Sequence, residues 1–185
     1  MRRLGSACAA ALAGGLASTV MALPASADTL TMHDPVGDDV TGQGHGDVTW
    51  VRVHYRAQRL KVTIKAARTG DVEHFQDLYV DVRRKDARPD LVISTNGDWE
   101  GWNVGFVSGW KRHHYRERCS GGPGSANYDY AHHVLRYSLP RACLMKKGAE
   151  QPKRIRLSLA TRTEWDKAYD WVKAKHTFGH WVTWK

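Results

Sequence analysis

The sequence predicts an all-β protein, an antiparallel β-sandwich of jelly-roll-like or immunoglobulin-like type with at most one short helix. Two observations lead to this fold class. Short segments alternate apolar and polar residues with a period of two, which is typical of a strand with one buried face. Turn-forming groups separate these segments, at 96–98, 120–124 and 147–148. Many short strands joined by polar turns are typical of two packed antiparallel sheets.

The first clear strands are 51–56 and 60–65, where aliphatic and aromatic residues alternate with arginine, histidine, lysine and threonine. Only Ala57, Gln58 and Arg59 separate them, so we expect an antiparallel hairpin. The same reasoning predicts further strands at 78–83, 91–94, 101–107, 128–139, 155–159 and 176–184.

One short segment has a helical pattern instead. Thr163 is a suitable N-cap, and Trp165, Ala168, Tyr169 and Val172 would share one face of a helix. Two acidic residues fall in the first turn, where they favour a helix start. The one short helix of the predicted fold is therefore expected at 163–172.

The N-terminus has the pattern of a secretory signal peptide. Arg2 and Arg3 are positive, residues 4–23 are largely apolar, and Ala25-Ser26-Ala27 offers small residues at a cleavage site. We therefore expect residues 1–27 to be removed and the protein to be secreted and extracellular. No later stretch has the apolar length of a membrane span, so no transmembrane segment is expected.

The remaining 158 residues (185 − 27), 28–185, are expected to form a single domain. Their net charge is (28 − 2) − 19 = +7 with neutral histidines. Such a charge attracts anionic partners such as acidic polysaccharides, other cell-wall polymers or nucleic acid, and it also serves solubility.

Two cysteines, Cys119 and Cys143, remain after the signal peptide, which contains Cys8, is removed. An oxidising compartment favours a disulfide between them. Closing their 24-residue separation (143 − 119) would stabilise the fold by about 3.5 kcal/mol. A redox or nucleophilic cysteine is the alternative, although neither lies in a Cys-x-x-Cys pair.

A glycine-rich acidic loop precedes the first strong strand. It contains Asp34, Asp38, Asp39 and Asp47. Calcium prefers six to eight oxygen ligands, which carboxylates and turned carbonyls supply together. The spacing differs from that of an EF-hand. The sequence thus indicates a structural calcium site, and the alternative is a loop in which aspartate and glycine simply form turns.

The opening motif, with Asp34, Gly37, Asp38 and Asp47, resembles the start of carbohydrate-binding and DOMON-type β-sandwich modules. That resemblance implies a calcium ion held by acidic residues of this loop. A wider resemblance, carried by 53–54, 137–144 and 169–170, is to small exported proteins of high-GC Gram-positive bacteria. It implies export, the β fold and the disulfide, and it says nothing about activity.

The densest basic and aromatic run lies at 110–118. Aromatic rings stack on sugars, and arginine binds anionic groups. The alternative is an exposed edge hairpin whose positive charges discourage strand pairing. The candidate ligand-binding residues are Trp110, Arg112, Tyr115, Arg116 and Arg118.

No catalytic motif is present, so we expect no enzyme. The ten histidines include the adjacent pairs 113–114 and 132–133 and the spaced pair His176 and His180. Adjacent side chains of a strand point to opposite faces, and a four-residue spacing brings two metal ligands together on a helix rather than on a strand. The predicted function is a secreted, non-catalytic binding or surface protein, calcium-stabilised, whose ligand is a carbohydrate or anionic polymer. The alternatives are a secreted hydrolase of an anionic polymer, such as a nuclease or cell-wall-active enzyme, and a structural envelope protein.

Overall fold

The computed structural model describes residues 28–38, 46–68, 75–83, 87–96, 100–110, 116–145, 150–164 and 167–184. The predicted signal peptide, together with Asp39, Arg112 and Tyr115, lies outside these residues. The first strand begins at Asp28, the residue that follows the predicted cleavage site.

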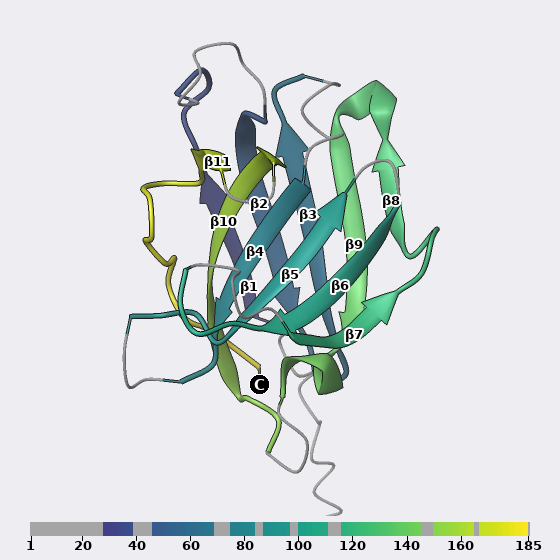
Figure 1. The fold of residues 1–185 in the computed structure, drawn as a ribbon, viewed down its shortest axis with the longest axis vertical. Helices are drawn as coiled ribbons and strands as arrows, with labels where there is room; N and C mark the ends of the chain where they lie inside the picture. The colour runs from purple at the N-terminus through teal and green to yellow at the C-terminus, as the bar shows by residue number, and fades with distance from the viewer. Residues whose placement is uncertain are drawn as a thin grey trace, which may run out of the picture.

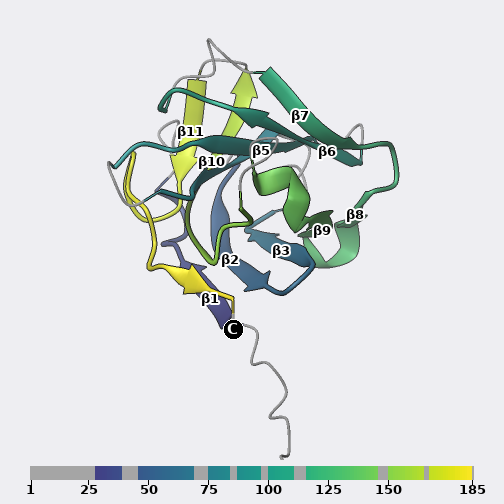
Figure 2. The same cartoon turned by 90° about the horizontal axis from the view of Figure 1, so that it is seen from below.

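Two antiparallel sheets pack face to face, which confirms the predicted β-sandwich (Figures 1 and 2). One sheet has the spatial order β1 (Asp28–His33), β2 (Val48–Tyr55), β3 (Arg59–Ala66), β9 (Val134–Pro140) and β8 (Ala126–Asp129). The other has the order β11 (Lys167–Trp171), β10 (Arg154–Glu164), β4 (Phe75–Asp81), β5 (Leu91–Asn96), β6 (Gly101–Phe106) and β7 (Arg116–Gly121), and β12 (Val182–Thr183) pairs with β10. We call them the five-stranded and the seven-stranded sheet.

The predicted hairpin at 51–65 is confirmed as β2 and β3. Val53 lies opposite Val62 in the register, and the Arg56 N–H donates to the Arg59 carbonyl at 3.0 Å to close the turn. The strand predicted at 128–139 is divided, because the 3-10 helix η2 (Tyr130–His132) separates β8 from β9. Within the strand predicted at 176–184, only Val182–Thr183 pairs as β12.

The helix predicted at 163–172 is wrong, because this segment forms the end of β10 and β11. The pairing of these strands shifts register between Thr161 and Arg162 and again between Arg162 and Glu164. Each irregularity breaks the two-residue alternation that identifies a strand in a sequence. Among the described residues there is no α-helix, only the short 3-10 helices η2 and η3 (Arg141–Leu144).

Figure 2 shows the two sheets as facing layers, and the side chains of their inner faces form one apolar core. Alternation places every second residue of each strand in this core, as the sequence pattern predicts. The fully buried residues at its centre include Val51, Val53, Ile64, Leu78, Val80, Ile93, Leu135, Leu157 and Leu159.

A buried arginine closes one end of the core. Arg141 is 2% exposed, and its guanidinium donates to the carbonyls of Ala57 at 2.8 Å and Pro152 at 3.2 Å. It also lies over the rings of Trp184, at 4.3 Å, and Tyr55, at 5.1 Å. The positive charge is therefore balanced by carbonyl dipoles and aromatic faces.

The predicted disulfide is confirmed. Cys119 of β7 and Cys143 of η3 are bonded, with their Cα atoms 5.6 Å apart. Because η3 follows β9 directly, the bond connects the edge of the seven-stranded sheet to the five-stranded sheet. Figure 1 shows η3, in green, at the end of the sandwich opposite β11.

Candidate functional site

Three aspartates meet at one end of the sandwich. Asp34 follows β1, Asp38 lies four residues later, and Asp170 belongs to β11. One carboxylate oxygen from each lies within 4.8 Å of the other two. We call this group the acidic centre. It joins the two sheets, because β1 belongs to the five-stranded sheet and β11 to the seven-stranded one.

Backbone N–H groups hold two of these carboxylates in place. The Asp34 N–H donates to the Thr49 carbonyl at 3.0 Å, which continues the pairing of β1 with β2. Asp34 Oδ1 accepts from the Lys173 N–H at 2.6 Å, and Asp170 Oδ2 accepts from the Val48 N–H at 3.1 Å. Val48 belongs to β2 and Lys173 follows β11, so the two hydrogen bonds connect the loop after β1 with the end of β11 and β11 with β2.

One oxygen of the acidic centre is buried without a donor. Asp34 is 8% exposed, and its Oδ2 has no hydrogen-bond partner among the described residues. Leaving a buried carboxylate oxygen unpaired is unfavourable by about 1–3 kcal/mol or more. A cation bound between the three carboxylates would satisfy this oxygen.

Asp47 shapes the loop beside the acidic centre. Its Oδ2 accepts from the Gly37 N–H at 2.8 Å, and Gly37 has a φ of 86°, which glycine adopts without strain. Asp47 is buried, and its negative charge acts on both Asp34 and Asp170. Four carboxylates therefore share a small volume at this end of the sandwich.

Burial and mutual repulsion raise the pKa of two aspartates of the acidic centre, Asp34 and Asp170. Burial raises the pKa of Asp34 to about 7, and Asp170, Asp38 and Asp47 add repulsion, against the opposing hydrogen bond from Lys173. Burial likewise raises the pKa of Asp170 to about 6, with repulsion from Asp38 and Asp47. A divalent cation would remove this repulsion, and hard carboxylate oxygens are the ligands that calcium prefers.

The acidic centre contains two of the four predicted metal ligands, Asp34 and Asp38. Asp47 lies next to it, and Asp39 is outside the described residues. Sequence reasoning missed Asp170, which comes from a strand more than 120 residues after the loop. No local pattern points to it, and the helix predicted there conceals the strand that carries it.

The structure describes only part of the predicted ligand-binding run, Trp110 and 116–118. Trp110 packs over the outer face of the seven-stranded sheet, with ring centroids 4.8 Å from both His176 and Phe178 and 5.3 Å from Tyr79 of β4. Arg118 lies on β7, three strands from β4, and its Nε donates to the Met145 carbonyl at 3.2 Å. The backbone of Arg116 pairs with Phe106 at the same edge. The half-buried Trp110 is part of a small aromatic cluster, so a ligand would reach only part of its ring.

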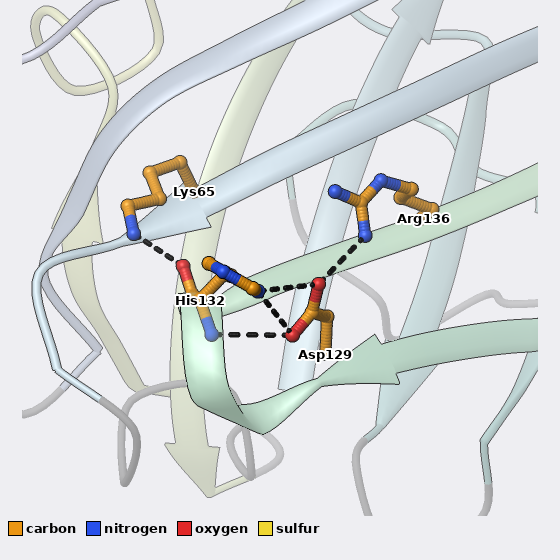
Figure 3. Close-up of polar contacts among 4 residues, drawn as sticks. All are labelled: Lys65, Asp129, His132 and Arg136. Atoms are coloured by element: carbon orange, nitrogen blue, oxygen red, sulfur yellow. Dashed lines mark hydrogen bonds and ion pairs between the residues drawn. The ribbon is translucent and has the colours of Figure 1, made fainter.

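An ordered pair of a histidine and a carboxylate lies at η2 (Figure 3). Asp129 accepts from the His132 backbone N–H at 3.2 Å and contacts His132 Nδ1 at 2.9 Å. The pKa of Asp129 is lowered, and the hydrogen bond from the His132 ring is the largest cause. Because His132 is 75% exposed, the pair is not enclosed in a concave site. Its geometry is that of an N-cap and does not favour the hydrolase alternative.

Comparisons with protein-family models, curated proteins and solved structures found no match. Within the described part of the chain, no helix is long and apolar enough to cross a membrane. There too, the acidic centre is the only group of three or more histidine, cysteine or acidic side chains close enough to hold a metal ion.

Proposed function

We propose that this protein is exported and acts outside the cell as a non-catalytic binding protein, with a carbohydrate or anionic polymer as its ligand and one calcium ion as a structural cofactor. The observation that carries the calcium proposal is the acidic centre, with its unpaired, buried Asp34 Oδ2. The resemblance of the opening motif to calcium-binding modules supports the same ion.

The position of the acidic centre indicates a structural role for the ion. Asp34 and Asp38 come from the loop after β1, and Asp170 comes from the other sheet. An ion held by all three would join the two sheets at the end opposite the disulfide. Its binding energy would stabilise the folded state, because the unfolded chain does not bring these residues together.

Two features support the binding role. Without residues 1–27 the chain carries 26 (28 − 2) basic against 19 acidic residues, a positive balance that attracts polyanions. The N-terminal signal pattern supports export of this charge from the cell.

Thermal melting of the secreted protein tests both parts. We expect calcium to raise the melting temperature relative to chelator, and magnesium to do so less, because this ion demands a more rigid octahedral geometry. The double variant D38N/D47N should melt lower than the wild type in calcium and no lower than it in chelator, where repulsion on Asp34 and Asp170 is reduced. The matched control is D129N, which removes a carboxylate from the exposed turn at η2 and should leave the calcium response intact.

Two results would contradict the proposal separately. An equal melting temperature in calcium and in chelator would exclude the structural ion. If a panel of neutral and acidic polysaccharides and single-stranded DNA gave neither a melting shift nor direct binding, the binding role would be wrong.

A further inference from the structure

The outer face of the five-stranded sheet is strongly basic. Alternation along β2, β3 and β9 sends every second side chain away from the core. Five of these side chains are cations, and we call their surface the basic face: Arg52, Arg59, Lys61, Lys65 and Arg136. The one acidic side chain described on this face is Asp129, so the balance is five positive charges against one negative.

Strand pairing brings cations from distant parts of the sequence together. Arg52 lies opposite Thr63, and Thr63 lies opposite Arg136 on the next strand. Neighbouring strands are about 4.8 Å apart, so the two arginines leave the sheet about 10 Å apart. In the adjacent row, His54 lies opposite Lys61. The cations therefore form a two-dimensional array.

Several of these cations are held in position. Arg59 donates to the hydroxyl and the carbonyl of Ser138, at 2.7 and 2.8 Å. Figure 3 shows Lys65 and Arg136 at one corner of the face, where Lys65 donates to the His132 carbonyl and Arg136 contacts Asp129 at 3.4 Å. Partly ordered donors lose less conformational entropy when they bind an anion.

The side chains between the cations are uncharged hydrogen-bonding groups. A single aromatic residue accompanies them among the described positions: Trp50, which lies 5.3 Å from the Arg52 guanidinium. The hydroxyl and amide groups are those of Thr29, Thr31, Thr63, Asn127 and Ser138.

The positive potential of the face acts on the histidine at its centre. His54 Nδ1 lies 2.9 Å from the Thr29 hydroxyl. Burial lowers the pKa of His54, and the charges of Arg56, Arg52 and Lys61 lower it further. An anion bound on the face would reduce this repulsion.

We infer that the basic face binds an acidic polysaccharide, which deepens and rests on the proposed polymer-binding function. A linear polymer of carboxylated sugars presents anionic groups separated by hydroxyls, and the face presents cations separated by hydroxyls and amides. Single-stranded nucleic acid is a poorer match, because its bases stack on several aromatic side chains. The face offers only Trp50 among its described residues.

Binding of polygalacturonate by the full secreted protein tests this inference, measured by titration calorimetry in low and physiological salt without free calcium, which cross-links this polymer through its carboxylates. The test variant is R52A/K61A/R136A, which removes three exposed cations. The matched control is K153A/K173A/K175A, which removes three exposed lysines next to β10 and β11 of the seven-stranded sheet. A third variant, R112A/R116A/R118A, removes the same charge from the basic and aromatic run. We expect the test variant to weaken binding about tenfold or more and the control to change it less than about twofold.

A further variant should strengthen binding. D129N removes the acidic group described on the face, while asparagine still caps η2. We expect tighter binding with an unchanged stoichiometry. Melting temperatures without polymer should be similar for all variants, since exposed charges contribute little to folding.

The outcomes separate this inference from the proposed function. Binding that survives R52A/K61A/R136A but is lost in R112A/R116A/R118A would overturn the basic face and leave polymer binding intact. Tighter binding of single-stranded DNA than of polygalacturonate would overturn the polysaccharide as ligand. If the wild type bound no polymer at all, the proposed function would fail as well.

Discussion

The variant D34N should stabilise the protein in chelator at neutral and alkaline pH. Asp34 is buried beside three other carboxylates, and its pKa is raised from 3.8 to about 7. Without a cation, its negative charge therefore opposes folding. Asparagine removes that charge and keeps an oxygen that accepts from the Lys173 N–H.

The size of the expected stabilisation follows from the raised pKa of Asp34. Well below pH 3.8 the carboxyl is protonated in both the folded and the unfolded protein, so it has no net effect on stability. As the pH rises from about 3 to 7, the unfolded chain ionises more readily, and stability is lost. The shift from 3.8 to about 7 corresponds to about 4 kcal/mol above pH 7, as an upper value for a group that relaxes on ionisation.

Urea unfolding in chelator at pH 4, 6 and 8 measures the effect, with the disulfide kept oxidised. The relevant quantity is the difference in unfolding free energy between D34N and the wild type, because other titrating groups cancel in it. We expect this difference to be near zero at pH 4 and to grow with pH. The control D129N should respond in the opposite direction, since the pKa of Asp129 is lowered and its charge supports the fold above its normal pKa.

The same comparison of D34N with the wild type is then made in calcium. At about one hundred times its Kd, a bound ion stabilises the wild type by about 2.7 kcal/mol. D34N should lose most of this response, so its advantage narrows in calcium. A difference between D34N and the wild type that is the same at pH 4 and pH 8 would refute the electrostatic reasoning.

Three other predictions concern stability. The variant C119S/C143S should lower the unfolding free energy by about 3.5 kcal/mol, and a loss below about 1 kcal/mol would show that the cross-sheet bond constrains little. The variant R141M removes the donor to the Ala57 carbonyl and one of the two donors to the Pro152 carbonyl, and it should destabilise by about 3 kcal/mol in urea unfolding; R141K, which keeps a donor, should lose less. The variant W110A should lower the unfolding free energy by about 2–3 kcal/mol and leave polygalacturonate binding unchanged. If binding were lost while the unfolding free energy stayed the same, stacking of the ligand on this ring would be favoured.

The sequence predicted the strands that keep a regular alternation. The hairpin of β2 and β3 was recognised because both strands alternate without interruption and only three residues join them. The disulfide followed from the count of cysteines after the predicted signal peptide. Strand β11 was missed, because register shifts in its partner β10 remove the alternation and leave a spacing that looks helical.

Two of the three aspartates of the acidic centre could be predicted from the sequence, since Asp34 and Asp38 lie four residues apart in a loop of metal-binding composition. Asp170 was not, because its approach depends on the packing of β11 beside the loop after β1. The same limit applied to the run at 110–118, whose sequence does not show that Trp110 lies against Tyr79 of β4 while Arg118 lies on β7, three strands away.

The sequence by itself thus determined the fold class, the β2–β3 hairpin and the disulfide partners, because these depend on short-range alternation and on residue counts. Only the tertiary structure decided that β9 pairs with β3, which places Arg136 in one row with Arg52, and that β11 meets the end of β1. The physical reason is that strand pairing across a sheet and packing between sheets depend on the burial of many distant side chains at once. No local sequence pattern indicates which distant strands pair or pack together.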